Sequence, residues 1–297
     1  MLHIRDPFVL ADPSDSTYYL FGTNQTSDGY AGYRSKDLES WEGPFPLSRN
    51  DAAFRGAKDF WAPECHMYGG KYYLFTTARS RTDSLPGSYI FVADTPLGPY
   101  REHSEGCVTP EGWRSLDGTL HIDGKGDPWL IFCHEWTQVG DGTIEAVRLS
   151  RDLKKALGRP QTLFSASSAS WVRSHEPDGN RFVADGPFPY RNKKGELLIL
   201  WSSFGEYGYA IGVARSPGGE ILGPWEQSPQ PLLEGDSGQG MLFRTFGGEL
   251  RLCLHCPNRP PVEKLFFYSL KETGDGLLDE PAMIVGPPRQ KKPERTR

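Results

Sequence analysis

Short apolar strands separated by turn residues recur along the whole chain. Five of these strands are alike, and they begin at Tyr18, Tyr72, Trp129, Leu197 and Leu250, at intervals of 54, 57, 68 and 53 residues. Each follows a turn-like segment that is itself preceded by a short strand, so the repeating unit is a β-hairpin. Because no long amphipathic helical run interrupts the pattern, the sequence predicts an all-β chain.

A third strand follows each hairpin, and four of the units then end in a closing phrase such as Lys36–Trp41 or Thr95–Tyr100. A sheet of about four strands repeated around an axis is a propeller blade. The five units therefore predict a five-bladed β-propeller that forms one domain over residues 1–285. Residues 286–297 are polar and read as a disordered tail.

Composition narrows the range of partners. The chain has 297 residues and a net charge of −5, and its only basic run is the segment 291–297, so neither a nucleic acid nor a membrane is expected as partner. No signal peptide is visible at the N-terminus, which predicts a cytoplasmic protein, or a secreted one if a signal has been removed. Aromatic residues make up 12% of the chain and suit a cleft for sugar rings.

Acidic residues recur at one register of the repeat. Asp6, Asp117 and Asp185 each lie 12 residues before the apolar strand of their unit, and Gln239 lies 11 before the last one. The first strands of all blades line the axis and run in the same direction, so these side chains are expected at one mouth of the channel. Asp-Pro and Asp-Gly are also ordinary turn dipeptides, but three at one register favour a shared site.

Carboxyl groups crowded around an axis repel one another and lose part of their hydration. Both effects separate their pKa values, so that one group holds a proton while another stays ionised. Such a pair on either side of a bound sugar is what hydrolysis of a glycosidic bond requires. The pattern therefore indicates a glycoside hydrolase whose partner is an oligosaccharide or polysaccharide.

The second strand of each hairpin returns to the same mouth and supplies further candidates. Glu135 is a fourth carboxylate there, and Trp136 is a platform for a sugar ring. His255 suits a site ligand, a metal ligand or a buried core histidine. Glu64, in the first strand of the second unit, is also expected to face the site.

At these residues the sequence resembles glycoside hydrolase family 43, the five-bladed-propeller enzymes that cut arabinose- and xylose-containing polysaccharides. The most specific motifs are Arg5–Phe8, Phe60–Glu64, Ser115–Gly118 and Val183–Pro187. The resemblance implies an inverting enzyme in which Asp6 is the general base and Asp117 orients the acid and tunes its pKa. It implies an exo-acting α-L-arabinofuranosidase or β-xylosidase that needs no cofactor for its chemistry.

Asp185 stands where the family usually has a glutamate, the general acid. Aspartate is one methylene shorter, which withdraws its proton by about 1.5 Å from the leaving oxygen. The acid is therefore Asp185, or else Glu135 or Glu64. The resemblance also implies a structural cation, often calcium, near the axis, and His255 is the matching position.

The predicted substrate-binding residues are Glu64, Trp61, Trp136, Phe8, Gln239 and Arg244. Two alternatives to the leading function are a carbohydrate-binding propeller without turnover and a galactan-directed hydrolase. A sialidase-type propeller would need an arginine cluster on the axis, for which Arg5, Arg79 and Arg244 are the candidates.

Overall fold

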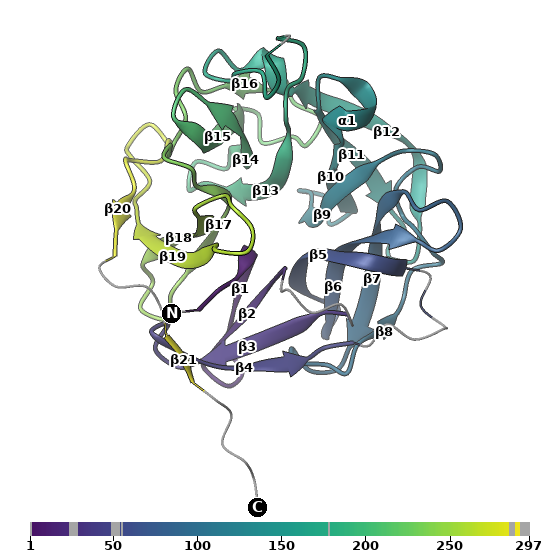
Figure 1. Ribbon diagram of the computed structural model, residues 1–297. Helices are drawn as coiled ribbons and strands as arrows, with labels where there is room; N and C mark the ends of the chain where they lie inside the picture. Colours follow the sequence, from purple (N-terminus) through teal and green to yellow (C-terminus); the bar gives the residue numbers. More distant parts are fainter. Residues whose placement is uncertain are drawn as a thin grey trace, which may run out of the picture.

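The computed structural model describes residues 2–23, 29–48, 54, 56–177, 179–284 and 289–291. Five small sheets stand around a central axis, which confirms the predicted five-bladed β-propeller (Figure 1). Blade 1 contains β1 (Arg5–Asp12), β2 (Thr17–Thr23), β3 (Ala31–Ser35), β4 (Ser40–Pro46) and β21 (Arg289–Lys291). Blade 2 contains β5 (Gly56–Tyr68), β6 (Lys71–Ser80), β7 (Pro86–Ala93) and β8 (Arg101–Glu102).

Blade 3 contains β9 (Ser115–Ile122), β10 (Pro128–His134), β11 (Thr143–Leu149) and β12 (Ala156–Ser165). Blade 4 contains β13 (Asp185–Arg191), β14 (Leu197–Gly205), β15 (Gly208–Ser216) and β16 (Glu226–Gln227). Blade 5 contains β17 (Gly238–Arg244), β18 (Leu250–Cys256), β19 (Lys264–Ser269) and β20 (Ala282–Met283). The helical elements are α1 (Trp136–Val139) and a 3-10 turn at Ala166–Ser168. Within the described residues, no helix is both long and apolar enough to cross a bilayer.

Turn chemistry and apolar packing explain the blades. Gly69 and Gly70 both have positive φ, 55° and 76°, and join β5 to β6 in a two-residue hairpin that favours glycine. Between blades, large side chains fill the gaps: the Trp201 ring of blade 4 lies 5.4 Å from the Phe164 ring of blade 3. Burying each such side chain stabilises the fold by about 2–3 kcal/mol.

Both ends of the chain meet blades 1 and 5. His3 pairs with Lys264 of β19, and the Leu265 amide donates to the Leu2 carbonyl, which links the start of the chain to blade 5. At the other end, β21 pairs in parallel with the outer strand β4 of blade 1. Within the segment predicted to be a disordered tail, Arg289–Lys291 form β21, while residues 286–288 and 292–297 lie outside the described residues, so the prediction for the tail stays a prediction.

The first strand of every blade contains a β-bulge at the same level, where two residues oppose one residue of the second strand. The first bulge residue has φ between 41° and 54° in all five blades, and we name this set the mouth tier: Asp6, Ala62, Asp117, Gly186 and Gln239. Only one of the five is glycine, although the left-handed region costs other residues about 1 kcal/mol or more. The bulges turn the strand ends toward the axis.

Candidate active site

A cavity of about 760 Å³ opens at the axis, and its wall is built from the bulges. Three mouth-tier side chains line it, those of Asp6, Asp117 and Gln239. The residues that immediately precede the bulges in the first four blades form a second level of the wall: Arg5, Trp61, Leu116 and Asp185. The three predicted aspartates, which are 179 residues apart at their extremes in sequence, therefore meet in one cavity.

The structure corrects the register that was expected for Asp185. Asp6 and Asp117 are the first residues of their bulges, whereas Asp185 precedes its bulge and pairs with Ser202. The equivalent position in blade 1 is Arg5, which pairs with Thr23. The count of 12 residues back from each apolar strand assumed that Leu197 is equivalent to Trp129. In the paired sheets Leu197 is equivalent to Pro128, one residue earlier, so Asp185 is equivalent to Leu116 and not to Asp117.

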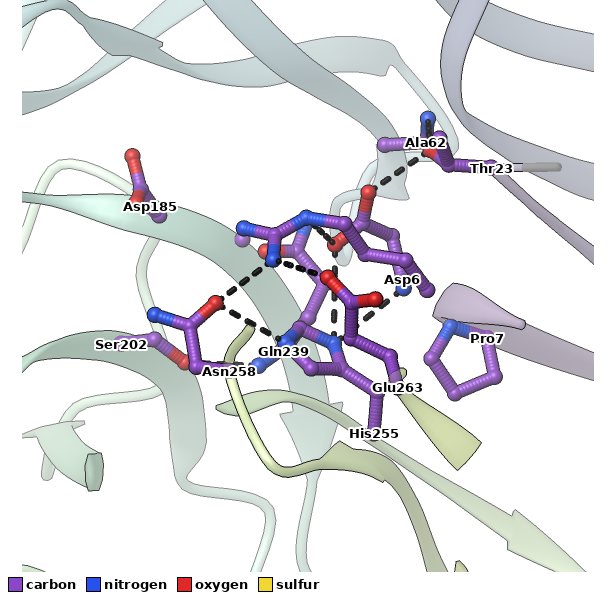
Figure 2. A network of polar contacts seen from close by, with 12 residues as sticks. Asp6, Pro7, Thr23, Ala62, Asp185, Ser202, Gln239, His255, Asn258 and Glu263 are labelled. Carbon is purple, nitrogen blue, oxygen red and sulfur yellow. Dashed lines mark hydrogen bonds and ion pairs between the residues drawn. The ribbon is translucent and has the colours of Figure 1, made fainter. Parts of the chain in front are cut away.

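Asp6 is held by hydrogen-bond donors and a cation. The Thr23 hydroxyl donates to Asp6 Oδ2 at 2.7 Å, and Arg5 Nε lies 3.5 Å from Asp6 Oδ1. The backbone amide of Asp6 donates to His255 Nδ1 at 3.2 Å (Figure 2). A hydroxyl donor and a guanidinium are partners that suit a carboxylate acting as a proton acceptor.

Asp117 and Asp185 lie in a different setting. Removal from water raises the pKa of the Asp117 carboxyl, and the charges of Asp185 and Asp6 raise it further. Hydrogen bonds from the Gly186 amide and Gln239 lower this pKa but do not offset the rise. Removal from water also raises the pKa of Asp185, against the Tyr209 hydroxyl and the charge of Arg5. Because the two carboxyls interact, the pair keeps a proton at a pH where an isolated carboxyl is ionised.

Gln239 supports this pair directly. Its side chain packs over Gly186, where an added Cβ would stand 2.5 Å from the Gln239 amide carbon. This close approach favours glycine at position 186, whereas the φ of 53° alone does not, since the other four mouth-tier residues have a similar φ. The predicted Gln239 is thus a cavity residue, in contact with the Asp117 carboxyl.

Two predicted substrate-binding residues lie one level below the cavity. Phe8 and Glu64 are the first paired residues after their bulges, and neither lines the cavity. The Phe8 ring packs against His66 and Phe188, with centroids 5.0 and 6.3 Å apart, and Glu64 Oε2 lies 3.2 Å from His66 Nε2. Both residues therefore lie outside the cavity lining, and Glu64 is displaced from the position of an acid.

Three other candidates lie outside the cavity wall. Glu135 forms a salt bridge of 2.6 Å with Arg114, which occupies the carboxylate that was considered as a substitute acid. Trp136 begins α1 and contacts the His175 ring edge-on at 5.3 Å. Arg244 is at the far end of β17, where it binds Glu272 at 2.8 Å, so the structure removes it from the mouth.

His255 does not fit the role of a direct metal ligand. Its Nδ1 accepts the Asp6 amide, and its Nε2 lies 3.3 Å from Asn258 Oδ1, so both ring nitrogens have partners within the protein. Burial lowers the pKa of the imidazole, which keeps it neutral. In the part of the chain that is described, no three His, Cys, Asp or Glu side chains are grouped to hold a metal.

Sequence reasoning overlooked three residues around the cavity, which are Tyr209, Asn258 and Glu263. Arg5 Nη1 donates to Asn258 Oδ1 at 2.6 Å and to Glu263 Oε1 at 3.1 Å, both on the loop after β18 (Figure 2). The Tyr209 hydroxyl donates to Asp185 Oδ2 at 2.8 Å from the start of β15. For Tyr209 the available signal was its place near the start of a third strand, whereas Asn258 and Glu263 lie on the connection between β18 and β19, outside the repeated strands.

Comparison with known proteins adds a family to this geometry. The chain is 23% identical to the extracellular endo-α-(1→5)-L-arabinanase 1 of Bacillus subtilis, over 78% of this chain and 70% of that protein. It is 25% identical to the extracellular exo-α-(1→5)-L-arabinofuranosidase of Streptomyces chartreusis, over 76% and 71%. The crystal structure of an endo-arabinase from Bacteroides thetaiotaomicron superposes with a TM-score of 0.86 at 42% identity, over 92% of this chain and 96% of that one.

The family model for "Glycosyl hydrolases family 43" matches residues 2–265, which include blades 2 to 4, most of blade 1, the first two strands of blade 5 and the complete cavity wall. The resemblance to this family implied a β-propeller with carboxyl groups at its axial mouth, and the structure has this architecture. The reaction of the family needs no cofactor, because two carboxyl groups and water suffice. The chain belongs to glycoside hydrolase family 43.

Proposed function

We propose that this glycoside hydrolase cleaves α-L-arabinofuranosyl bonds by single displacement with inversion at the anomeric carbon. The observation that carries the proposal is the contrast between the donors around Asp6 and the proton-retaining pair Asp117–Asp185 in one cavity. Arabinose is favoured as the sugar because the relatives compared above are named for arabinan or arabinofuranoside substrates.

In this mechanism Asp6 is the general base. Its charged carboxylate, held by Thr23 and Arg5, takes a proton from the water that attacks the anomeric carbon. The carboxyl of Asp185 protonates the departing oxygen, and Tyr209 fixes the orientation of that carboxyl through Oδ2. Asp117, tied to the Gly186 amide next to Asp185, repels a negative charge on Asp185, and this repulsion raises the pKa of Asp117.

Glu135 is not needed as a substitute acid in this proposal. Its salt bridge to Arg114 holds it outside the cavity wall, whereas Asp185 lines the cavity directly. The shorter side chain is accommodated because Asp185 stands before the bulge, at the level of Arg5 and Trp61.

The test is a panel of α-1,5-arabino-oligosaccharides, p-nitrophenyl α-L-arabinofuranoside, p-nitrophenyl β-D-xyloside and a galactan, with NMR detection of the first anomer released. We expect cleavage of the arabinosides with initial formation of the β-anomer. Cleavage of the xyloside or galactan alone, initial release of the α-anomer, or binding without turnover would each overturn the proposal. The lengths of the products test the exo mode that the sequence predicts, since an endo enzyme releases oligosaccharides first.

A further inference from the structure

Every amide of the mouth tier is held by an acceptor from the preceding blade. The Ala62 amide donates to Thr23 Oγ1 at 2.7 Å, and the Asp117 amide donates to Thr77 Oγ1 at 2.9 Å. The Gln239 amide donates to Ser202 Oγ at 2.9 Å, and the Asp6 amide donates to His255 Nδ1 at 3.2 Å. Figure 2 shows three of these links around Asp6.

The four acceptors occupy one equivalent position. Each is the residue of the second strand that pairs with the residue before the bulge: Thr23, Thr77, Ser202 and His255. They form an inter-blade ring that fixes the left-handed backbone from which the mouth-tier side chains project. Thr77, Ser202 and His255 are completely buried, so an amide left without its acceptor there would lack water as a replacement.

Blade 3 departs from this ring. The equivalent residue is Cys133, which pairs with Leu116 and is also completely buried. The Gly186 amide faces the Cys133 thiol, but a thiol sulfur is only a weak hydrogen-bond acceptor. The Gly186 amide instead donates to Asp117 Oδ2 at 3.0 Å, so a catalytic carboxylate takes the fifth place in the ring.

We infer that Thr77 and Cys133 are positioning residues for the hydrolytic reaction. Thr77 anchors the Asp117 backbone, and the weak acceptor at Cys133 leaves the Gly186 amide to the Asp117 carboxylate. The consequence is a direct tie between Asp117 and the residue that follows Asp185. The inference rests on the proposed roles of Asp117 and Asp185, but it makes no use of which sugar is cleaved.

The first test is Cys133→Ser, which introduces at blade 3 the acceptor that blade 4 has at Ser202. The new hydroxyl competes for the Gly186 amide, and the charged Asp117 carboxylate loses part of a hydrogen bond. The fully ionised pair then becomes less favourable, so the alkaline limb of the activity profile moves to higher pH by roughly half a unit to one unit. An unshifted limb in a folded variant would overturn the role of Cys133.

The second test compares two adjacent threonines that are both completely buried. Thr77→Val removes the acceptor of the Asp117 amide, and we expect kcat to fall by roughly 10-fold or more with KM little changed. Thr76→Val is the matched control, because the Thr76 hydroxyl donates to the Tyr89 carbonyl, and neither residue lines the cavity. Equal losses of kcat in the two variants would show a merely structural role and would refute the inference for Thr77.

A readout without turnover separates this inference from the proposed function. Titration of ¹³C-labelled aspartate carboxyls by NMR, with Asp117→Asn to assign the resonance, follows the proton on the pair directly. Cys133→Ser should move the Asp117 transition to higher pH even if no arabinoside is cleaved. A transition at the same pH as in the parent protein would refute the inference, whatever substrate the enzyme accepts.

Discussion

Two corners of the cavity use the same backbone motif for opposite electrostatic purposes. Asp6 and Asp117 both begin a bulge with left-handed φ, 51° and 54°. Asp6 is surrounded by a hydroxyl donor and a guanidinium, whereas Asp117 faces other carboxyls and has its pKa raised by removal from water. The repeated sheet therefore sets where a carboxyl points, and its partners differ: the Asp6 carboxylate is contacted from its own blade, whereas the Asp117 carboxyl is contacted by Gly186 of blade 4.

The largest effect is expected at the first corner. Asp6→Asn removes the proposed base with little change in the size of the side chain, and activity should fall roughly 10²–10⁴-fold. Asp127→Asn is a matched control, since Asp127 pairs with Arg148 and Arg151 and does not line the cavity. Steady-state rates on an arabinofuranoside measure both. If the Asp6 variant were about as active as the control, Asp6 would not be the base, and Asp6 and Asp117 would not have the contrasting roles described above.

The second corner is tested by the leaving group. Asp185→Asn should reduce hydrolysis of an arabino-oligosaccharide by roughly 10²–10³-fold, but reduce it much less for an activated aryl arabinoside, because a good leaving group needs little protonation. Glu135→Gln should change both rates only a few-fold, since Glu135 is paired with Arg114. The reverse order of the two variants would make Glu135 the acid.

A third prediction concerns pH. The repulsion between Asp117 and Asp185 raises the pKa of Asp117, and Asp117→Asn removes it, so the alkaline limb of the activity profile should move to lower pH. The same substitution affects stability with a definite sign. A carboxyl whose pKa is raised in the folded state contributes stability below its unfolded pKa and loses that contribution as pH rises through the folded pKa.

Asparagine has no such loss, so the Tm of the Asp117→Asn variant relative to the parent should increase from pH 5 to pH 8. We expect an increase of roughly 2 °C or more by calorimetry. A Tm difference that is constant with pH would mean that Asp117 titrates like an isolated carboxyl, and the two corners would no longer differ.

The smallest effect concerns the wall between the corners. Trp61 belongs to blade 2, between Asp6 of blade 1 and Asp117 of blade 3, and it lines the cavity with Arg79 5.5 Å from its ring. Trp61→Ala should raise KM roughly 5- to 10-fold if a sugar ring stacks on it. Arg244→Ala should leave KM unchanged because Arg244 lies at the other end of β17. A KM that rises with Arg244→Ala and not with Trp61→Ala would reverse this assignment.

The propeller fold and the convergence of the three aspartates could be predicted from the sequence, because both follow from the repeated hairpins. Hairpins that begin at comparable apolar strands must form comparable blades, and Asp6, Asp117 and Asp185 lie before such strands. Side-chain direction was less readable. A bulge adds one residue and reverses the alternation of faces, which is why Phe8 and Glu64 are beneath the cavity.

Loop residues carried no periodic signal. Asn258 and Glu263 come from a proline-rich connection, and only the folded chain brings them to Arg5. Arg244 was predicted at the site by its charge alone, although β17 carries it away from the mouth. Polar residues on strands are thus predictable to within one residue, and those on connections only after the blades are assembled.

The inter-blade ring has a mechanical consequence. Because the amide under each mouth-tier side chain is gripped by the adjacent blade, no blade can tilt without moving the groups on the next one. A substitution that loosens the packing between any two blades, even near the outer strands, would shift the mouth-tier side chains at the cavity. The orientation of the cavity carboxyls therefore depends on the rigidity of the whole propeller and not of any single blade.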